Sequence, residues 1–546
     1  MKGFLHPISL SNRWAVRLSF LILSVACVSL GAHAQRWDNY PPANKYVRLT
    51  QTNLPIVFIN VNTTMILREE RITARMKIID NGEGELNYAD TVTHPGQRID
   101  YDGYAAIKYR GNSSFDASDK KPYSIKLIDK PLEEGGEKLK AKLLGMGKDN
   151  DWVLLAPYSD KSMIRDVLSF ELARRYFDFV PHARFCELFL DGTYYGVYIL
   201  SERVRKGKHR LPLNDPGEDN GDLTGDYHFE IDRPDEPHVY YSKQRPVFNN
   251  GTRINWRSIC FQYKSPEYED FATLPGGTRL AMINELDKME TALASNNYTD
   301  PDLGYAKYID VTSFIDYQLS TEFAFNIDGY RLSTNIYKMS KTHAENEGLD
   351  HRWKMSLWDM NIAFGNANYY EGNRTDKWQY EFNDRHAYED GNVVPFWWQR
   401  LMSDPEYVRQ LKTRWTQYRQ EDYSDEHIEF VIDSLVTKLT CEGAVDRNQQ
   451  AWRIIGKNVW PNYFVGQTYG EEIDYLKDWI QKRVAFLDKN WYDEQLDIPQ
   501  LTNGDEGRSA LPSRVYTIDG QRVNAPRKGI NIIRRADGST YKIGIR

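Results

Sequence analysis

Residues 183–204, ARFCELFLDGTYYGVYILSERV, carry the strongest short-range folding signal in the chain. Two runs rich in β-branched and aromatic residues flank the dipeptide Asp191-Gly192, which favours a tight turn between antiparallel strands. We therefore predict a β-hairpin here, whose two strands extend a larger sheet.

The segment before the hairpin supplies the rest of that sheet. Four stretches between turn signals read as strands: LPIVFINVN at 54–62, ITARMKIID at 72–80, AAIKYRGNSS at 105–114 and YSIKLID at 123–129. Between them and the hairpin, residues 160–177 place Ile164, Val167, Leu168 and Leu172 at helical spacing, with Ser162 as a candidate N-cap. We expect an antiparallel β-region followed by one helix.

The character of the sequence changes after a stretch rich in Pro and Asn near 234–256. Helical periods then dominate at 279–294, 311–327, 405–420, 426–440 and 471–491. A β-rich half before a helical half predicts an α+β, bilobal protein. We divide the chain into an antiparallel β-rich N-terminal lobe with one main helix, a mostly helical C-terminal lobe, a polar linker and a small β-type tail, at 45–233, 257–492, 493–512 and 513–546.

The N-terminus predicts export. Three basic residues, Lys2, Arg13 and Arg17, come before the apolar run LSFLILSVACVSL. Small residues at Ala32 and Ala34 then suit cleavage before Gln35. We take residues 1–34 as a signal peptide and expect no transmembrane anchor in the mature chain. The net charge of −7 excludes a general nucleic-acid backbone binder.

Three polar residues of the second half are candidates for chemistry. Asp328 and Asn335 are seven residues apart, so they converge on one helix face or across a helix and a loop. Asp359 ends an apolar run in MSLWDMNIAFGN, a place that suits a ligand for a hard metal such as Mg²⁺. Phosphoryl-transfer sites use an acid, an amide and an acid in this order. The competing interpretation is that these residues cap polar turns.

The β half offers residues that suit a phosphate. YRGNSS at 109–114 is a small polar turn, and Lys126 and Ser124 share one face of their strand. Glu171 falls inside the apolar stripe of its helix, where a charge needs a partner. We predict an ion pair between Lys126 and Glu171, by analogy with kinases. Arg174 and Arg175 are competing partners for Glu171, and a solvated Lys126 is the alternative.

These stretches, together with DWVLLAPYSDKSMIRDVLSFELARR, YHFEIDR and NIDGYRLSTNIYKM, resemble the CotH kinase family over residues 55–365. The resemblance implies an atypical protein kinase-like fold that uses ATP and a divalent metal, Mg²⁺ or Mn²⁺. It implies that Asp328 is catalytic and that Asn335 and Asp359 are metal ligands. The nucleotide-binding candidates are Lys126, Glu171 and Arg110. One departure is Asn361, which stands where many members of the family carry a second acid.

The expected substrate is Ser or Thr of an exported or surface protein, with the enzyme in the periplasm, on the cell surface or outside the cell. The end of the chain, VYTIDGQRV to YKIGIR, also resembles the C-terminal tails of exported Bacteroidetes-type proteins. The alternative is a catalytically weak or inactive kinase-like scaffold that binds a cell-surface glycan or a structural protein. Aromatic clusters such as PFWWQRL at 395–401 and GNANYYEGNR at 365–374 could stack on a sugar. A hydrolase with paired carboxylates ranks last.

Overall fold

The computed structural model describes residues 39–493, 514–517, 521–523, 529–534 and 540–545. The predicted signal peptide and nearly all of the predicted linker lie outside these residues. None of the helices that the structure describes is both long enough and apolar enough to cross a membrane.

Seven strands form a closed barrel in the order β2-β3-β5-β6-β7-β9-β8. The strands are β2 (Ile56–Asn60), β3 (Ile72–Ile79), β5 (Ile99–Tyr109), β6 (Tyr123–Ile128), β7 (Asp151–Leu155), β8 (Ala183–Leu190) and β9 (Thr193–Ser201). A two-stranded sheet of β1 (Gln51–Thr52) and β4 (Asn87–Tyr88) lies beside it. The prediction of a purely antiparallel region is wrong at one seam, because β2 pairs with β8 in parallel. This pairing closes the barrel and leaves it without free strand edges.

The predicted hairpin is confirmed as β8 and β9. Asp191 and Gly192 both have positive φ, 45° and 76°, as a type I′ turn requires. The Asp191 carboxylate also accepts hydrogen bonds from the backbone of Val61 (2.8 Å) and Thr63 (3.1 Å), just beyond β2. The turn therefore ties the hairpin to the strand that it meets at the parallel seam.

A second sheet has the order β11-β12-β10-β13-β14. Its strands are β10 (Tyr227–Ile231), β11 (Val239–Tyr241), β12 (Cys260–Ser265), β13 (Thr334–Lys338) and β14 (Lys354–Ser356). β10 comes from the region assigned to the β-rich lobe, yet it pairs with β13 from the helical half. Phe229 and Ile336 point to the core while their neighbours Glu230 and Asn335 line the opposite face, so the sheet is apolar on one side and polar on the other.

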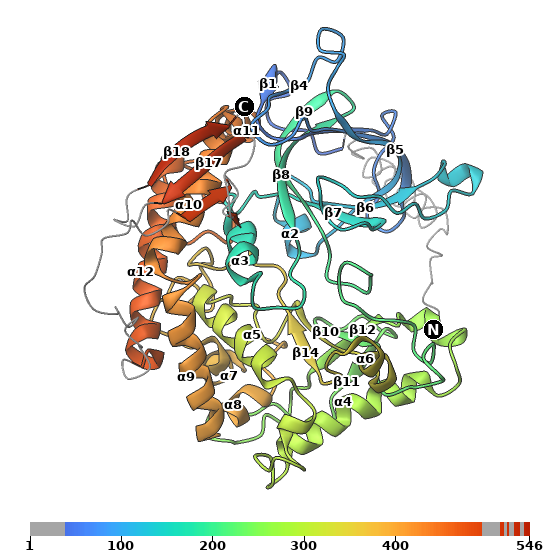
Figure 1. Cartoon of the computed structure of the whole chain (residues 1–546), viewed down its shortest axis with the longest axis vertical. Coiled ribbons are helices and arrows are strands. Elements are labelled where there is room, and N and C mark those ends of the chain that lie inside the picture. Colours follow the sequence, from blue (N-terminus) through green and yellow to red (C-terminus); the bar gives the residue numbers. More distant parts are fainter. Residues whose placement is uncertain (1–38, 494–513, 518–520, 524–528, 535–539, 546) are drawn as a thin grey trace, which may run out of the picture.

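Helices pack against the apolar side of this second sheet and fill the lower left of Figure 1. The long ones match the periodic segments: α4 (Thr278–Ala294), α5 (Val311–Ala324), α9 (Pro405–Gln420), α10 (Asp425–Thr440) and α12 (Tyr469–Trp491). The shorter ones are α2 (Ser113–Asp116), α3 (Arg165–Ala173), α6 (Lys341–Glu347), α7 (Phe382–His386), α8 (Trp397–Met402) and α11 (Ala444–Trp452). The mixed α+β class, with sheet in the N-terminal part and helices in the C-terminal part, is confirmed.

Two local expectations need correction. Helix α3 begins at Arg165 instead of near Ser162, and the Asp160 carboxylate accepts from the Arg165 backbone N–H (2.9 Å). Trp397 and Trp398 of the PFWWQRL cluster are fully buried in the helical core, so they are not available to stack on a sugar.

In the C-terminal tail, four strands form a sheet in which Tyr516 packs on Phe430 of α10. The strands are β15 (Arg514–Thr517), β16 (Arg522–Val523), β17 (Gly529–Arg534) and β18 (Thr540–Ile545).

Candidate active site

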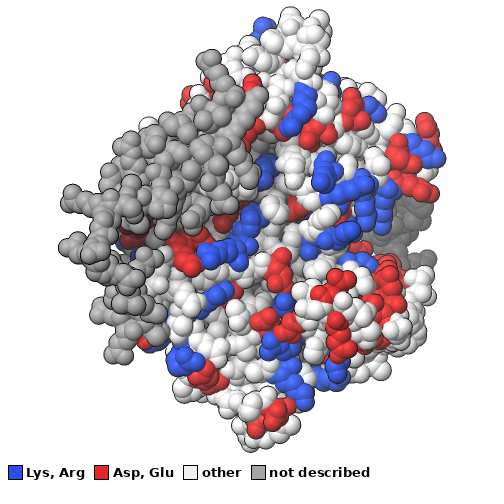
Figure 2. Space-filling view, in the orientation of Figure 1, with Lys and Arg blue, Asp and Glu red and all other residues white. Residues whose placement is uncertain are grey.

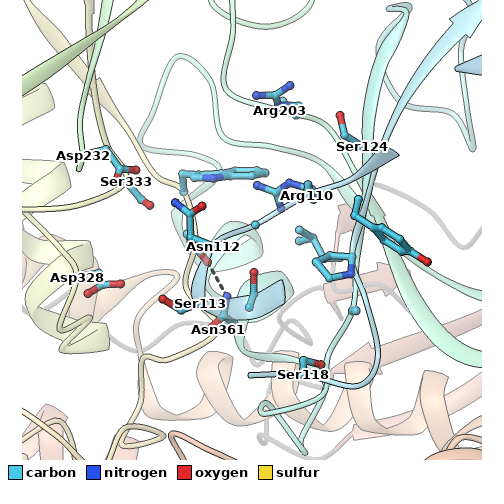
Figure 3. Close-up of a pocket in the computed structure, with 18 of the residues that line it drawn as sticks. Arg110, Asn112, Ser113, Ser118, Ser124, Arg203, Asp232, Asp328, Ser333 and Asn361 are labelled. Atoms are coloured by element: carbon cyan, nitrogen blue, oxygen red, sulfur yellow. Dashed lines mark hydrogen bonds between the residues drawn. The ribbon is translucent and has the colours of Figure 1, made fainter. Parts of the chain in front are cut away.

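A cavity of about 810 Å³ lies between the outer face of the barrel, the polar face of the second sheet and the turn that follows α5. In Figure 3, Asp232, Asp328 and Ser333 lie on one side of it, Ser124 and Arg203 lie on the barrel side, and Arg110 lies between them. The cavity brings together five of the six residues predicted from sequence: Arg110, Lys126, Asp328, Asn335 and Asp359. Its size is that of a small-molecule site.

Asp328 lies in the turn after α5, where Phe325 takes a left-handed conformation (φ 42°) and ends the helix. The Arg331 guanidinium donates to Asp328 Oδ1 (2.9 Å) and to Asp390 Oδ2 (2.8 Å). Arg331 is buried, and its guanidinium also lies 4.3 Å from the centroid of the Phe382 ring. The carboxylate of Asp328 is therefore held in one orientation at the edge of the cavity.

Asn335 projects from β13, opposite Glu230 on β10 and Ser356 on β14. Its Oδ1 lies 2.8 Å from Nε2 of His228, and its Nδ2 donates to the Ser333 carbonyl (3.2 Å). Burial lowers the pKa of His228 to about 4, so the ring is neutral and Nε2–H acts as the donor. Sequence reasoning did not find His228, although the alternation in YHFEIDR places it on the same face as Glu230.

Asp359 follows β14 with a left-handed backbone (φ 60°) that turns its carboxylate into the cavity. Burial raises the pKa of this carboxyl, and the positive charge of Arg110 lowers it. The negative charge of Asp328 raises the pKa further. The Asn361 amide donates to Asp359 Oδ1 (2.5 Å). Asn361 therefore helps to orient the carboxylate of Asp359 in the cavity lining.

Arg110 lies just after β5, with its guanidinium carbon 5.5 Å from the centroid of the Trp358 ring. Burial lowers the pKa of Arg110 and Arg203 lowers it further, while the charges of Asp359, Glu230 and Asp166 act in the other direction. Asp166 on α3 accepts a hydrogen bond from the Met360 backbone (2.7 Å), and burial and Asp359 raise its pKa to about 8. Helix α3 thus contributes an acid to the cavity, but at a different position from the one predicted.

The predicted ion pair between Lys126 and Glu171 is wrong. Glu171 does not line the cavity, and its carboxylate accepts from Arg174 Nη2 (2.8 Å), which was the competing partner. Lys126 instead lies opposite Asp151 in the register of β6 and β7. The physical reason is local, because Arg174 is one helical turn after Glu171 and reaches it without any tertiary contact.

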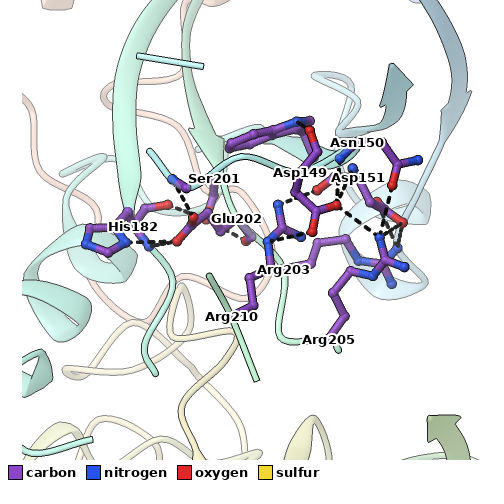
Figure 4. Close-up of polar contacts among 11 residues, drawn as sticks. Asp149, Asn150, Asp151, His182, Ser201, Glu202, Arg203, Arg205 and Arg210 are labelled. Carbon is purple, nitrogen blue, oxygen red and sulfur yellow. Dashed lines mark hydrogen bonds and ion pairs between the residues drawn. The ribbon is translucent and has the colours of Figure 1, made fainter. Parts of the chain in front are cut away.

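Asp151 belongs to a network that organises cations along the barrel side (Figure 4). Arg203 and Arg205 contact its carboxylate at 3.4 and 3.6 Å, and Arg210 donates to its backbone carbonyl (2.6 Å). Burial raises the pKa of Asp151, but Arg203, Arg205 and Lys126 together bring it below its ordinary value. A charged Asp151 therefore holds Lys126 and Arg203 at the cavity.

Arg71 completes this cationic wall, which we define as Arg71, Lys126 and Arg203. Its guanidinium donates to the carbonyls of Ala106 (3.0 Å) and Ser124 (2.9 Å), and burial lowers its pKa to about 10. Figure 2 shows Lys and Arg side chains gathered on this face over the lower edge of the barrel, near β6 and β7. The cavity thus has a cationic barrel side and an acidic side formed by Asp328, Asp359 and Asp166. Such a division suits a polyanion that also carries a metal ion.

A second group of metal-type ligands, Asp219, Asp226 and His343, lies away from this cavity. His343 Nδ1 and Asp226 Oδ1 are 2.6 Å apart, and Asp226 also accepts from the Asn214 backbone (3.1 Å). These contacts satisfy the group internally and fasten the loop before β10 to α6.

One family model matches the chain. It is described as CotH kinase protein, and it matches residues 107–273 and 277–487. The matched ranges contain every cavity residue discussed above except Arg71. No curated protein matches the sequence.

Proposed function

Since the chain belongs to the CotH kinase family, we propose that it is an exported atypical protein kinase that transfers the γ-phosphoryl group of ATP to Ser or Thr of an exported protein. The observation that supports this function best is the convergence of Asp328, Asn335 and Asp359 with Arg110 and Lys126 in one cavity. These residues come from β5, β6, β13 and two turns, over more than two hundred positions of sequence.

The donor set fits a hard divalent cation. Asp359 presents a half-buried carboxylate and Asn335 a carbonyl oxygen, and Glu230 lies across the strand pair from Asn335. Oxygen donors of this kind suit Mg²⁺ or Mn²⁺. A metal held there would neutralise charge on the β- and γ-phosphates. Burial raises the pKa of the Asp359 carboxyl, and a cation beside it would favour the ionised form.

The protein's own residues then divide the work. Asp328 accepts the proton of the acceptor hydroxyl while the oxygen of that hydroxyl bonds to the γ-phosphorus. The bond between that phosphorus and the bridging oxygen breaks, and ADP leaves with the electron pair. Arg331 keeps Asp328 in place, while Arg110 and the cationic wall hold phosphate oxygens. In this proposal the barrel acts as the N-terminal lobe of a bilobal kinase, and the second sheet with its helices acts as the C-terminal lobe.

The deciding experiment is transfer of radiolabelled phosphate from ATP by the purified mature protein in the presence of Mg²⁺ or Mn²⁺. Asp359→Ala is expected to abolish transfer, and Asp328→Ala to reduce it by about 10² to 10⁴-fold. Asp474→Ala, which removes an exposed acid of α12, serves as the matched control and should keep wild-type activity. The proposal fails if the wild type transfers no phosphate and binds no nucleotide in a metal-dependent way.

A second candidate function is a kinase-like scaffold that binds a cell-surface glycan. An exposed aromatic stack favours it, since the rings of Trp256 and Tyr388 are 5.1 Å apart and 27° from parallel, and Phe248 packs beside them. Glycan-array binding that survives Asp328→Ala and Asp359→Ala but is lost with Tyr388→Ala would support this function over the kinase.

A further inference from the structure

Tyr369 and Trp460 form a stacked aromatic pair at the cavity, which we call the aromatic shelf. Their ring planes are 9° apart and their centroids are separated by 5.6 Å. Both residues line the cavity together with Pro461. Trp460 remains 46% exposed, so the shelf opens to solvent. The kinase chemistry described above makes no use of it.

Backbone and amide contacts hold the shelf in place. Asn368 N donates to the Pro461 carbonyl (2.8 Å), Tyr463 N donates to the Asn366 carbonyl (3.0 Å), and Ala367 pairs with Asn462 as an antiparallel bridge. The buried Asn462 amide also donates to Asn366 Oδ1 (2.8 Å) and to the Ser159 carbonyl (2.6 Å). The two rings are therefore fixed relative to each other before any ligand arrives, which lowers the entropic cost of binding.

The shelf lies beside the proposed acceptor acid. Burial raises the pKa of the Tyr369 phenol, and the charge of Asp328 raises it further. The Asn366 amide donates to the Asn361 carbonyl (2.9 Å), which connects the shelf to the turn that carries Asp359. In an in-line transfer the acceptor and the leaving group lie on opposite sides of the phosphorus. Because Tyr369 and Asp328 line the same cavity and the charge of Asp328 acts on Tyr369, a group that rests on this ring lies near the acceptor hydroxyl of the proposed reaction.

The surroundings of the shelf favour an apolar ring as its occupant. The amides of Asn366 and Asn462 are buried and bonded to one another, so they are not available to match sugar hydroxyls. A nucleobase normally enters an enclosed pocket, whereas Trp460 is half exposed. Tyr and Trp give large, rigid contact areas of the kind that anchor polypeptides, and proline docks on such surfaces.

We propose that the aromatic shelf binds an aromatic or proline side chain next to the acceptor Ser or Thr of a polypeptide substrate. The proposal rests on the phosphotransferase function stated above and names the class of acceptor for the same site. It predicts sequence selectivity that comes from Trp460 and Tyr369 and is independent of nucleotide binding.

The test uses an array of peptides with a central Ser and with Trp, Phe, Pro, Gly, Asp or Lys on each side. Binding of the full-length mature protein is measured first with Mg²⁺ and a non-hydrolysable ATP analogue, and phosphorylation with radiolabelled ATP is measured second. Peptides with a flanking ring should bind and react at least about tenfold better than those with Gly. The binding measurement tests the shelf even if no peptide is phosphorylated. Failure of phosphorylation would count against the proposed function, whereas failure of ring-selective binding would count against the shelf.

Three variants make the result specific. Trp460→Ala should raise the KM for ring-bearing peptides about tenfold and leave the Kd for ATP unchanged. Tyr369→Phe keeps the ring and should keep the preference. Tyr388→Ala removes a ring that is 74% exposed and does not line the cavity, so it should change neither constant.

Four outcomes would overturn the proposal. The first is that the binding experiment shows no preference for ring-bearing peptides, and the second is that this preference persists in Trp460→Ala. The third is that Trp460→Ala changes the Kd for ATP and leaves peptide binding unchanged. The fourth is that free oligosaccharides are phosphorylated in preference to every peptide. The third outcome would assign the shelf to the nucleobase and the fourth to a sugar acceptor.

Discussion

Asn361 shows how one side chain sets the charge of the candidate site. Its amide donates to Asp359 at the position where many members of the family carry a second acid. A carboxylate at that position would face Asp359 as a like charge, whereas the amide orients Asp359 without repulsion. The amide at position 361 therefore leaves the cavity with one negative charge fewer than a carboxylate there would give.

Asn361→Asp is expected to reverse this balance. The variant loses the hydrogen bond to Asp359 and adds a second buried charge, so its unfolding free energy in EDTA should fall by about 1–3 kcal/mol. Because a divalent metal relieves the repulsion, Mg²⁺ with ATP should raise the Tm of the variant more than that of the wild type. Thermal unfolding with and without the metal measures both effects.

Asn361→Ala is the control for that experiment, because it removes the hydrogen bond and adds no charge. It should lose stability in EDTA without gaining the additional response to Mg²⁺. An Asn361→Asp variant as stable as the wild type in EDTA would contradict the interpretation.

Three of the predicted residues that line the cavity share one property. Asp328, Asn335 and Asp359 each lie at a turn or on a short strand within apolar segments, so their polarity stands out against the local pattern. Glu171 also stood out, but its partner is one turn away on the same helix. His228 and Asp166 were missed because their roles depend on contacts across 107 and 194 residues, which no local pattern reveals. Arg331 lies only three residues from Asp328, but it is also held by burial and by Asp390, which is 59 residues away.

At the scale of elements, strong local signals were sufficient for the hairpin and the long helices. The Asp191-Gly192 turn and the long apolar stripes each specify their element without help from the rest of the chain. The second sheet was not predicted, because its strands are three to six residues long and two of them come from segments about a hundred residues apart. Pairing of that kind is decided by tertiary contacts.

The packing of α4 on α8 predicts that the stability of the protein depends on pH. Glu290 of α4 accepts from Trp397 Nε1 (2.9 Å) and Ser242 Oγ (2.6 Å), and burial raises its pKa to about 7. The folded protein keeps this proton between pH 4.5 and 7 while the unfolded chain releases it, so stability falls as the pH rises through this window. Glu290→Gln removes the titration and should gain up to about 3 kcal/mol relative to the wild type by pH 7, with no further change above it.

Denaturant unfolding at several pH values from 4.5 to 8 measures the effect. Glu426→Gln, an exposed residue of α10, should keep the wild-type dependence on pH. A constant difference between Glu290→Gln and the wild type over this range would show that Glu290 is ionised in the fold.

The contact between α11 and the barrel makes a second prediction at this scale. Asn448 Oδ1 accepts from the buried Lys120 Nζ (2.9 Å) and from Val197 N of β9 (3.1 Å). Asn448→Ala leaves the buried Lys120 amine and the Val197 N–H each short of an acceptor and should cost about 3 kcal/mol of unfolding free energy. Gln450→Ala, on the exposed face of the same helix, should change it by less than about 0.5 kcal/mol. Equal stabilities for the two variants would exclude Lys120 as the reason that α11 docks.

At the scale of the whole molecule, the barrel and the helical part do not separate at residue 233. The hydrophobic cluster of the barrel includes Ala451, Trp452, Ile454 and Val459 from the C-terminal half. Arg447 forms an ion pair with the buried Glu187 of β8 (2.8 Å). A segment of the C-terminal half therefore packs against the barrel and completes its hydrophobic cluster.

A fragment of residues 39–233 is expected not to fold on its own. It would expose the apolar surface that Trp452 covers, remove the Arg447 partner of the buried Glu187 carboxylate and remove the Asn448 acceptor of the buried Lys120 amine. We expect it to bind a hydrophobic dye and to unfold without cooperativity, as measured by fluorescence and near-ultraviolet circular dichroism. Co-expression with residues 234–493 should restore a cooperative transition. Cooperative unfolding of the fragment alone would show that the barrel is an independent domain.

The sequence by itself determined the α+β class, the hairpin, the long helices, the resemblance to the family and the three polar residues of the candidate site. Each of these depends on hydrophobic periodicity, turn chemistry or a short motif, which act over a few residues. Only the tertiary structure decided that the barrel closes through a parallel seam, that β10 joins β13, that Lys126 faces Asp151 instead of Glu171, and that Tyr369 meets Trp460 beside Asp328. Those contacts join segments that are distant in the chain, and burial and electrostatics select among them only once the whole chain has packed.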